Sequence, residues 1–268
     1  MVYPDYHSRR GQSLKIEDSH SGINRRVRAL SIIIKAITIS GIRLPKLYVN
    51  SINYMFFDSE FPGEHVSGLK ELTSLKVEVN QVGVRRPHGD LEPNGHECSG
   101  ILQKGALIYL LDAARKLTSL HVGLDSPGWR FTDAAATIGA VIPLAIPFPC
   151  LEKLSLACIR GSEQEFTQLL CSHARTLRKL RLTASLLEPA GNLANIFETA
   201  RSKLRLEEAR FKGLFQNYNL ANGREKGPTW DMGAETGRLL EGYMLKGGEC
   251  LLTDDYGEFY RMKGHSHL

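Results

Sequence analysis

An aliphatic pattern of the form Leu-x-x-Leu-x-Leu recurs along much of the chain. Strictly alternating apolar positions at its end predict a short strand with one buried face. Three of the five intervals between successive copies, 44 to 72, 151 to 177 and 177 to 206, are within or close to about 20 to 29 residues, the usual length of a leucine-rich repeat. Four clear copies and two looser flanking ones begin at Leu72, Leu117, Leu151 and Leu177, and at Leu44 and Leu206.

A helical periodicity precedes three of these strands. Four side chains at spacing i, i+3, i+4, i+7 lie on one stripe of an α-helix, so the repeating unit is predicted to be a helix followed by a strand. A less regular stripe, in which β-branched residues disfavour a helix, precedes Leu44. The stripes are Leu107, Leu110, Leu111 and Ala114; Phe166, Leu169, Leu170 and His173; Leu193, Ile196, Phe197 and Ala200; and Val27, Leu30, Ser31 and Ile34.

The order of these elements predicts an α/β fold, an irregular leucine-rich-repeat solenoid with parallel strands on one side and helices on the other. We assign residues 25–216 to the solenoid and residues 1–24 to a flexible polar arm. Residues 217–268 are expected to form a C-terminal cap or a loosely ordered tail, with a short helix around Gly233 to Leu245. The alternative is that each copy is an ordinary amphipathic segment of a globular core.

Two insertions interrupt the repeats. Residues 85–100 are rich in glycine, proline, asparagine and aspartate, which predicts a surface loop. Residues 125–149 combine turn formers with a small-residue stretch, Ala134 to Ala136, that could form a short helix. Both are expected where a solenoid displays its variable loops.

Composition indicates an ordinary soluble protein of 268 residues, with 42% hydrophobic and 24% charged residues. The densest apolar run, residues 138–148, contains two prolines and is shorter than the roughly 20 residues that a membrane span requires. Five widely spaced cysteines without a Cys-x-x-Cys pair favour neither a disulfide framework nor a zinc site. With no secretion signal in the polar N-terminus, these features predict a cytoplasmic or nuclear protein without a membrane partner.

Motifs for catalysis are missing from the sequence. It contains no phosphate-binding Gly-x-x-x-x-Gly-Lys-Ser/Thr loop, no Gly-x-Ser-x-Gly elbow and no His-Glu-x-x-His helix. The adjacent His96, Glu97 and Cys98 are expected to be a solvated loop rather than metal ligands, and Asp254 and Asp255 a solvated pair. We therefore predict no enzyme activity, no metal and no cofactor.

The residues between the leucines of each strand should point outward and form an exposed sheet surface. At these positions and the next outward position of each strand, seven cations, including Lys212, outnumber Glu78 and Glu208, which predicts a surface for an acidic protein segment. The alternative is that the charges only keep the sheet soluble. The net charge of +5 is too small and scattered to indicate nucleic acid. The candidate protein-binding residues are Lys46, Tyr48, Lys76, His121, Lys153, Lys179, Arg181 and Arg210.

The repeats resemble the leucine-rich region of fungal F-box-like proteins. The resemblance rests on residues 68–75, 113–120, 148–156 and 166–182 and covers about residues 25–245. It implies a substrate-recognition region of a ubiquitin ligase. Family members carry a helical F-box before the repeats that binds the Skp1 adaptor, whereas only the polar arm precedes the repeats here, which argues against a Skp1-type partner. Two interpretations follow: a stand-alone recognition protein, or a ligase component whose F-box is missing or degenerate.

Overall fold

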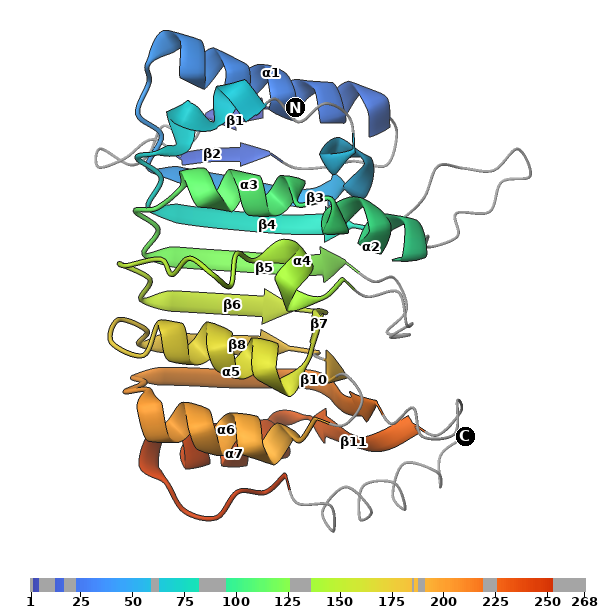
Figure 1. Cartoon of the computed structure of the whole chain (residues 1–268), viewed down its shortest axis with the longest axis vertical. Coiled ribbons are helices and arrows are strands. Elements are labelled where there is room, and N and C mark those ends of the chain that lie inside the picture. Colours follow the sequence, from blue (N-terminus) through green and yellow to red (C-terminus); the bar gives the residue numbers. More distant parts are fainter. Residues whose placement is uncertain are drawn as a thin grey trace, which may run out of the picture. The chain divides into compact units, whose positions relative to one another are not determined.

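The computed structural model describes residues 2–4, 13–16, 23–58, 63–81, 95–125, 136–184, 186–187, 191–218 and 226–252. It is a mixed α/β structure with mostly parallel strands and a layer of helices (Figure 1). The chain divides into two compact units, Met1–Leu151 and Glu152–Leu268, each of which is considered by itself.

The described residues of unit 1 form five strands in sequential order. They are β1 (Val2–Pro4), β2 (Ser13–Ile16), β3 (Lys46–Asn53), β4 (Ser74–Asn80) and β5 (Ser119–Asp125). β1 and β2 are antiparallel, and the pairs from β2 to β5 are parallel. The register aligns equivalent positions of the sequence pattern, which produces continuous apolar rows: Leu47, Leu75 and Leu120 in one, and Val49, Val77 and Val122 in the next.

The helices of unit 1 are α1 (Ile23–Ser40), the 3-10 helices η1 (Tyr54–Phe57) and η2 (Gly63–Leu69), α2 (Gly95–Gln103), α3 (Ala106–Ala113) and α4 (Ile138–Val141). The stripe predicted for α3 is confirmed, because its four residues are buried. α1 is helical despite its β-branched residues and buries Leu30 and Ile34. Burial of that stripe outweighs the small intrinsic penalty of isoleucine in a helix.

Unit 2 contains the parallel strands β6 (Lys153–Ala157), β8 (Lys179–Thr183) and β10 (Glu208–Tyr218). The short strands β7 (Arg160–Gly161) and β9 (Leu186–Leu187) continue the pairing at the end of β10, and β11 (Lys226–Met232) pairs with β10 in the antiparallel direction. The equivalent leucines are again in register: Leu154, Leu180 and Ala209 align, as do Leu156, Leu182 and Phe211.

The helices in the described part of unit 2 are α5 (Glu163–Ser172), α6 (Leu193–Lys203) and α7 (Ala234–Lys246). α5 begins at a capping box, in which the Glu165 amide donates to Ser162 Oγ and the Ser162 amide donates to the Glu165 carboxylate. The predicted stripes of α5 and α6 are buried, and Phe197 of α6 packs edge to face on Phe211 of β10. The short helix predicted around residues 233–245 is confirmed as α7.

A repeated hydrogen-bond pattern joins the starts of β4, β5, β8 and β10 to the strand that each pairs with. In unit 1, the amides of Thr73 and Ser74 both donate to the Pro45 carbonyl, and those of Thr118 and Ser119 both donate to the Thr73 carbonyl. In unit 2, the same paired donation recurs: Arg178 and Lys179 donate to the Glu152 carbonyl, and Glu207 and Glu208 to the Arg178 carbonyl. The same paired hydrogen bonds therefore recur at equivalent positions of the sequence pattern in both units.

A left-handed backbone residue also recurs, two positions after the last apolar residue of the pattern. Ser51, Cys158, Ala184 and Gly213 have φ values of 55°, 56°, 46° and 77°. Positive φ is costly for residues with a side chain, so these residues mark a local bend in four of the six copies, whereas the equivalent Val79 and Leu124 lack it. The Cys158 and Ala184 amides donate to Thr183 and Lys212 carbonyls on the next strand, which holds this bend in place.

Several elements differ from the sequence predictions. The loop expected over residues 85–100 is wrong for residues 95–100, which begin α2; Cys98 and Leu102 form a buried i, i+4 pair that the glycines at 95 and 100 obscure. Residues 85–94 and the stretch Ala134–Ala135 lie outside the described residues, and the helix found nearby is α4. Within residues 1–24, expected as a flexible arm, the structure has β1 and β2.

Candidate protein-interaction face

The outward positions of β6, β8 and β10 form a basic surface, which we call the unit 2 strand face. Its first row aligns Lys153, Lys179 and Glu208, and its second row aligns Ser155, Arg181 and Arg210. Lys212 lies in a third row beside Thr183 of β8. The alternation of β8, in which Lys179 and Arg181 are exposed while Leu180 and Leu182 are buried, places these charges opposite the core.

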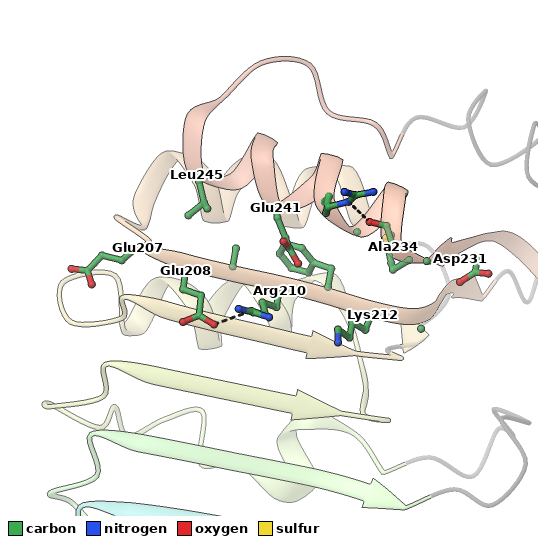
Figure 2. Close-up of a pocket in the computed structure, with 15 residues that line it drawn as sticks. Glu207, Glu208, Arg210, Lys212, Asp231, Ala234, Glu241 and Leu245 are labelled. Carbon is green, nitrogen blue, oxygen red and sulfur yellow. Dashed lines mark hydrogen bonds and ion pairs between the residues drawn. The ribbon is translucent and has the colours of Figure 1, made fainter.

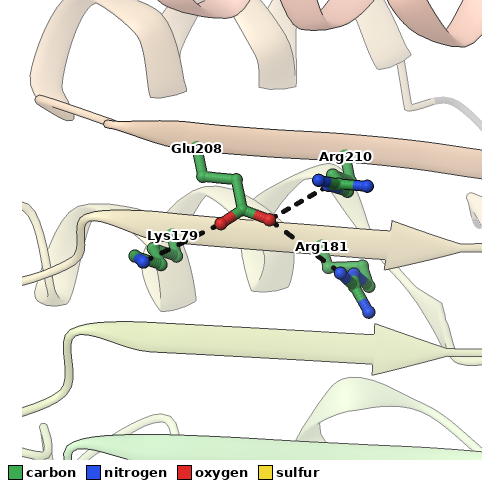
Figure 3. A network of polar contacts seen from close by, with 4 residues as sticks. All are labelled: Lys179, Arg181, Glu208 and Arg210. Atoms are coloured by element: carbon green, nitrogen blue, oxygen red, sulfur yellow. Dashed lines mark hydrogen bonds and ion pairs between the residues drawn. The ribbon is translucent and has the colours of Figure 1, made fainter.

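Glu208 is the centre of an ion-pair cluster on this face (Figure 3). Its carboxylate lies 3.0 Å from Arg210 Nε, 3.8 Å from Lys179 Nζ and 3.9 Å from Arg181 Nη2. The side chains are 38% to 51% exposed, so each pair stabilises the fold by about 1 kcal/mol or less. The cluster therefore contributes little to stability, but it shows that three cations converge on the position of one carboxylate.

The cations of the unit 2 strand face exceed the charge that Glu208 can neutralise. The face carries five cations, Lys153, Lys179, Arg181, Arg210 and Lys212, against one carboxylate. Within the described part of the chain, neither Lys153 nor Lys212 has an ion-pair partner. A net charge of about +4 over three adjacent strands creates a positive local potential that attracts anionic groups.

A groove of about 930 Å³ borders this face, between β10 and α7. Glu208, Arg210 and Lys212 line its β10 side, and Glu241 and Leu245 point toward the strand from α7 (Figure 2). Gly237 lets the helix approach closely, because a Cβ atom there would lie 2.6 Å from the Phe211 carbonyl oxygen. The lining of the groove is of mixed charge, with the four carboxylates Glu207, Glu208, Asp231 and Glu241 beside the three cations Arg210, Lys212 and Arg238.

The corresponding surface of unit 1 is close to neutral. Its rows align Lys46 with Ser74 and Ser119, and Tyr48 with Lys76 and His121. Glu78 lies 2.8 Å from Lys76 Nζ and 3.5 Å from His121 Nε2. Ser74 Oγ donates to Tyr48 Oη at 3.4 Å. With two lysines and one glutamate on these three strands, unit 1 presents a polar, hydrogen-bonded face.

All eight residues predicted to bind protein occupy strand positions away from the core, four in each unit. The structure gathers Lys179, Arg181 and Arg210 around a single carboxylate and places Lys153 beside Lys179. The sequence analysis did not identify Glu208 as their common partner. Aligning the repeats on Leu177 and Leu206 would have revealed it, because that alignment sets Glu208 beside Lys179.

The other residues considered for chemistry have structural contacts. The Tyr54 hydroxyl donates to the Glu97 carboxylate at 2.7 Å, and burial raises the pKa of the Cys98 thiol to about 12. His173 is buried, as its place in the stripe predicts, with Nδ1 2.7 Å from the Leu169 carbonyl oxygen. Among the described residues, no group of three or more His, Cys, Asp or Glu side chains is arranged to hold a metal ion.

Comparisons with family models, curated proteins and solved structures found no match to this chain. In the part of the chain that the structure describes, no helix combines the length and apolar character needed to cross a membrane.

Proposed function

We propose that this chain is a non-catalytic protein-interaction module, an irregular leucine-rich-repeat solenoid, that binds an acidic protein segment in the cytoplasm or nucleus. The recurring helix–strand unit with its paired hydrogen bonds supports the solenoid. The observation that carries the binding role is the convergence of Lys179, Arg181 and Arg210 on one carboxylate. A carboxylate of the bound segment would lie near Glu208 and contact the same cations.

The arrangement of charges supports binding over mere solubility. Like charges directly beside one another on neighbouring strands are destabilising, and Lys153 stands beside Lys179, as does Arg181 beside Arg210. A sheet selected only for solubility would mix charges of both signs, as the unit 1 face does with Lys76 and Glu78. Binding of an acidic partner offsets this repulsion, and the positive potential of the face raises the rate of association.

The resemblance to F-box-like proteins motivates the second candidate, a component of a ubiquitin ligase. The repeated units resemble a substrate-recognition region, and the same basic face would then receive the substrate. The two candidates differ in one partner, because only the second requires contact with a Skp1-type adaptor.

Affinity capture with mass spectrometry tests the proposal on the full chain. The variant Lys179→Glu/Arg181→Glu should lose the captured partners, and those partners should share acidic segments. Arg175→Glu/Arg205→Glu is the matched control, since it makes the same charge change at two exposed residues of unit 2 outside its helices and strands. Unchanged capture by the face variant would remove the unit 2 strand face from consideration, and recovery of a Skp1-type adaptor with the intact chain would favour the ligase component.

A further inference from the structure

Two arginines lie side by side in the middle of the unit 2 strand face. Arg181 of β8 is paired in register with Arg210 of β10, and the following outward row pairs Thr183 with Lys212. Neighbouring strands are about 4.8 Å apart, and outward positions along one strand are separated by about 7 Å. A single small anion above these four positions can therefore contact Arg181, Arg210 and Lys212 together.

The Glu208 carboxylate lies at one side of this position and contacts both arginines. Lys179 lies on one side of the carboxylate, and Arg181 and Arg210 lie on the other (Figure 3). Arg210 Nε donates a hydrogen bond to Glu208 at 3.0 Å, and Arg181 Nη2 lies 3.9 Å from the same carboxylate. Since a guanidinium group has five N–H donors, these contacts orient the two arginines and leave further donors on each for a second anion.

The charge and the donors at this position fit a phosphate group better than a second carboxylate. Arg181, Arg210 and Lys212 carry three positive charges, of which Glu208 can neutralise one. A phosphate monoester has about −1.5 to −2 charge at pH 7 and three strong acceptor oxygens, whereas a carboxylate has one charge and two oxygens. Guanidinium groups bind phosphate oxygens in a bidentate geometry, and the Thr183 hydroxyl adds a neutral donor beside Lys212.

We propose that Arg181, Arg210 and Lys212 bind a phosphorylated serine or threonine within the acidic segment, so that phosphorylation of the partner controls its binding. This inference rests on the proposed function, because it names the chemical group that the same face recognises. Lys153 and Lys179, which are paired in the first row, attract the carboxylates that flank the phosphate. The aligned rows of the unit 1 face contain no arginine, so the preference for phosphate should belong to unit 2.

Three labelled peptides test the proposal on the full chain. They share the sequence Gly-Glu-Asp-Xaa-Asp-Glu-Gly and carry serine, aspartate or phosphoserine at the central position. The phosphoserine peptide should bind at least about tenfold more tightly than the other two, because only its phosphate can accept from both guanidinium groups. Displacement of this peptide by an equal concentration of inorganic phosphate would show capture of the free anion and would overturn recognition of a modified segment.

A charge-conserving variant tests the role of the two guanidinium groups. Arg181→Lys/Arg210→Lys keeps both positive charges but removes the planar forks. It should reduce the preference for phosphoserine over aspartate to less than about threefold, while the aspartate peptide binds within about threefold of its wild-type affinity. Arg175→Lys/Arg205→Lys, at two exposed residues outside the helices and strands of unit 2, is the matched control and should keep the full preference.

The peptides also separate this inference from the proposed function. Binding of the serine and aspartate peptides that is lost in Lys179→Glu/Arg181→Glu, without any gain from phosphoserine, would preserve the acidic-segment function and overturn the phosphate site. An unchanged preference for phosphoserine in Arg181→Lys/Arg210→Lys would also overturn the site. Failure of all three peptides to bind the wild-type chain would overturn both.

Discussion

The outward surfaces of the two units differ although their backbones repeat the same construction. Both units use paired amide donors at the start of two of their strands and align apolar residues in rows. On three equivalent strands, however, unit 1 places two lysines and one glutamate, whereas unit 2 places five cations and one glutamate. The repeat fixes the inward positions through burial and leaves the outward ones free to vary, so evidence for function lies in the outward positions.

The largest expected effect is the loss of stability when an inward-facing leucine is truncated, and this loss should be equal in the two units. Leu120 in unit 1 and Leu180 in unit 2 are fully buried at equivalent positions, so Leu120→Ala and Leu180→Ala should each lower the free energy of unfolding by about 2–5 kcal/mol. Urea unfolding measures the loss, and hydrogen exchange locates it in the unit that carries the change. A cost below about 1 kcal/mol in either unit would contradict an equivalent core.

A smaller effect is expected at the recurring left-handed bend. Gly213 has a φ of 77°, in the position that Ala184 and Cys158 occupy in the preceding repeats. Adding a side chain should strain the backbone, and Gly213→Ala is expected to lower the free energy of unfolding by about 1–2 kcal/mol. Urea unfolding followed by circular dichroism provides the measurement. A stabilising substitution would show that the bend tolerates a side chain there freely.

The smallest expected effect is a pH dependence of stability, which arises from the helix stripe of unit 2 that contains His173. Ala114 ends the stripe before β5, while His173 ends the stripe before β8, where burial holds its pKa below the ordinary value of 6.5. The imidazole of His173 therefore binds a proton more readily in the unfolded chain than in the folded one. Its contribution to the free energy of unfolding is fully present above pH 6.5 and is lost as the pH falls below that value, by at most about 1.4 kcal/mol per pH unit.

Replacing this imidazole should reduce the pH dependence. His173→Gln is expected to flatten the decrease in unfolding free energy between neutral and mildly acidic pH, measured by urea titration at several pH values. Ser172→Ala serves as the control, because it removes a neighbouring hydroxyl, 3.0 Å from His173 Nδ1, without removing the titrating group. An identical slope in His173→Gln would rule out a contribution from this residue.

Periodicity predicted much of the architecture because burial leaves a clear trace in sequence. The i, i+3, i+4, i+7 stripes correctly located α3, α5 and α6, and the alternating leucines located β4, β5, β6 and β8. The same alternation assigned Lys179 and Arg181 to the exposed side of β8. These predictions rest on local patterns, which a single sequence contains in full.

Features without a clear local pattern, and those that depend on strand register, were not predicted. β10 also pairs with β11, which buries Trp230 in a stretch that shows little apolar periodicity. The bend at Ala184 has no sequence signal, because only glycine or asparagine would indicate positive φ. The role of Glu208 depends on the register between strands, so a list of outward residues could not show which cations it meets.

The central claim is that binding of an acidic segment belongs to the unit 2 strand face, and a comparison of two charge reversals tests it most directly. In the full chain, Lys179→Glu/Arg181→Glu should weaken binding of a labelled acidic peptide by at least about tenfold, whereas Lys46→Glu/Lys76→Glu on unit 1 should change it by less than about threefold. Equal losses from the two reversals, or a larger loss from the unit 1 reversal, would contradict the account.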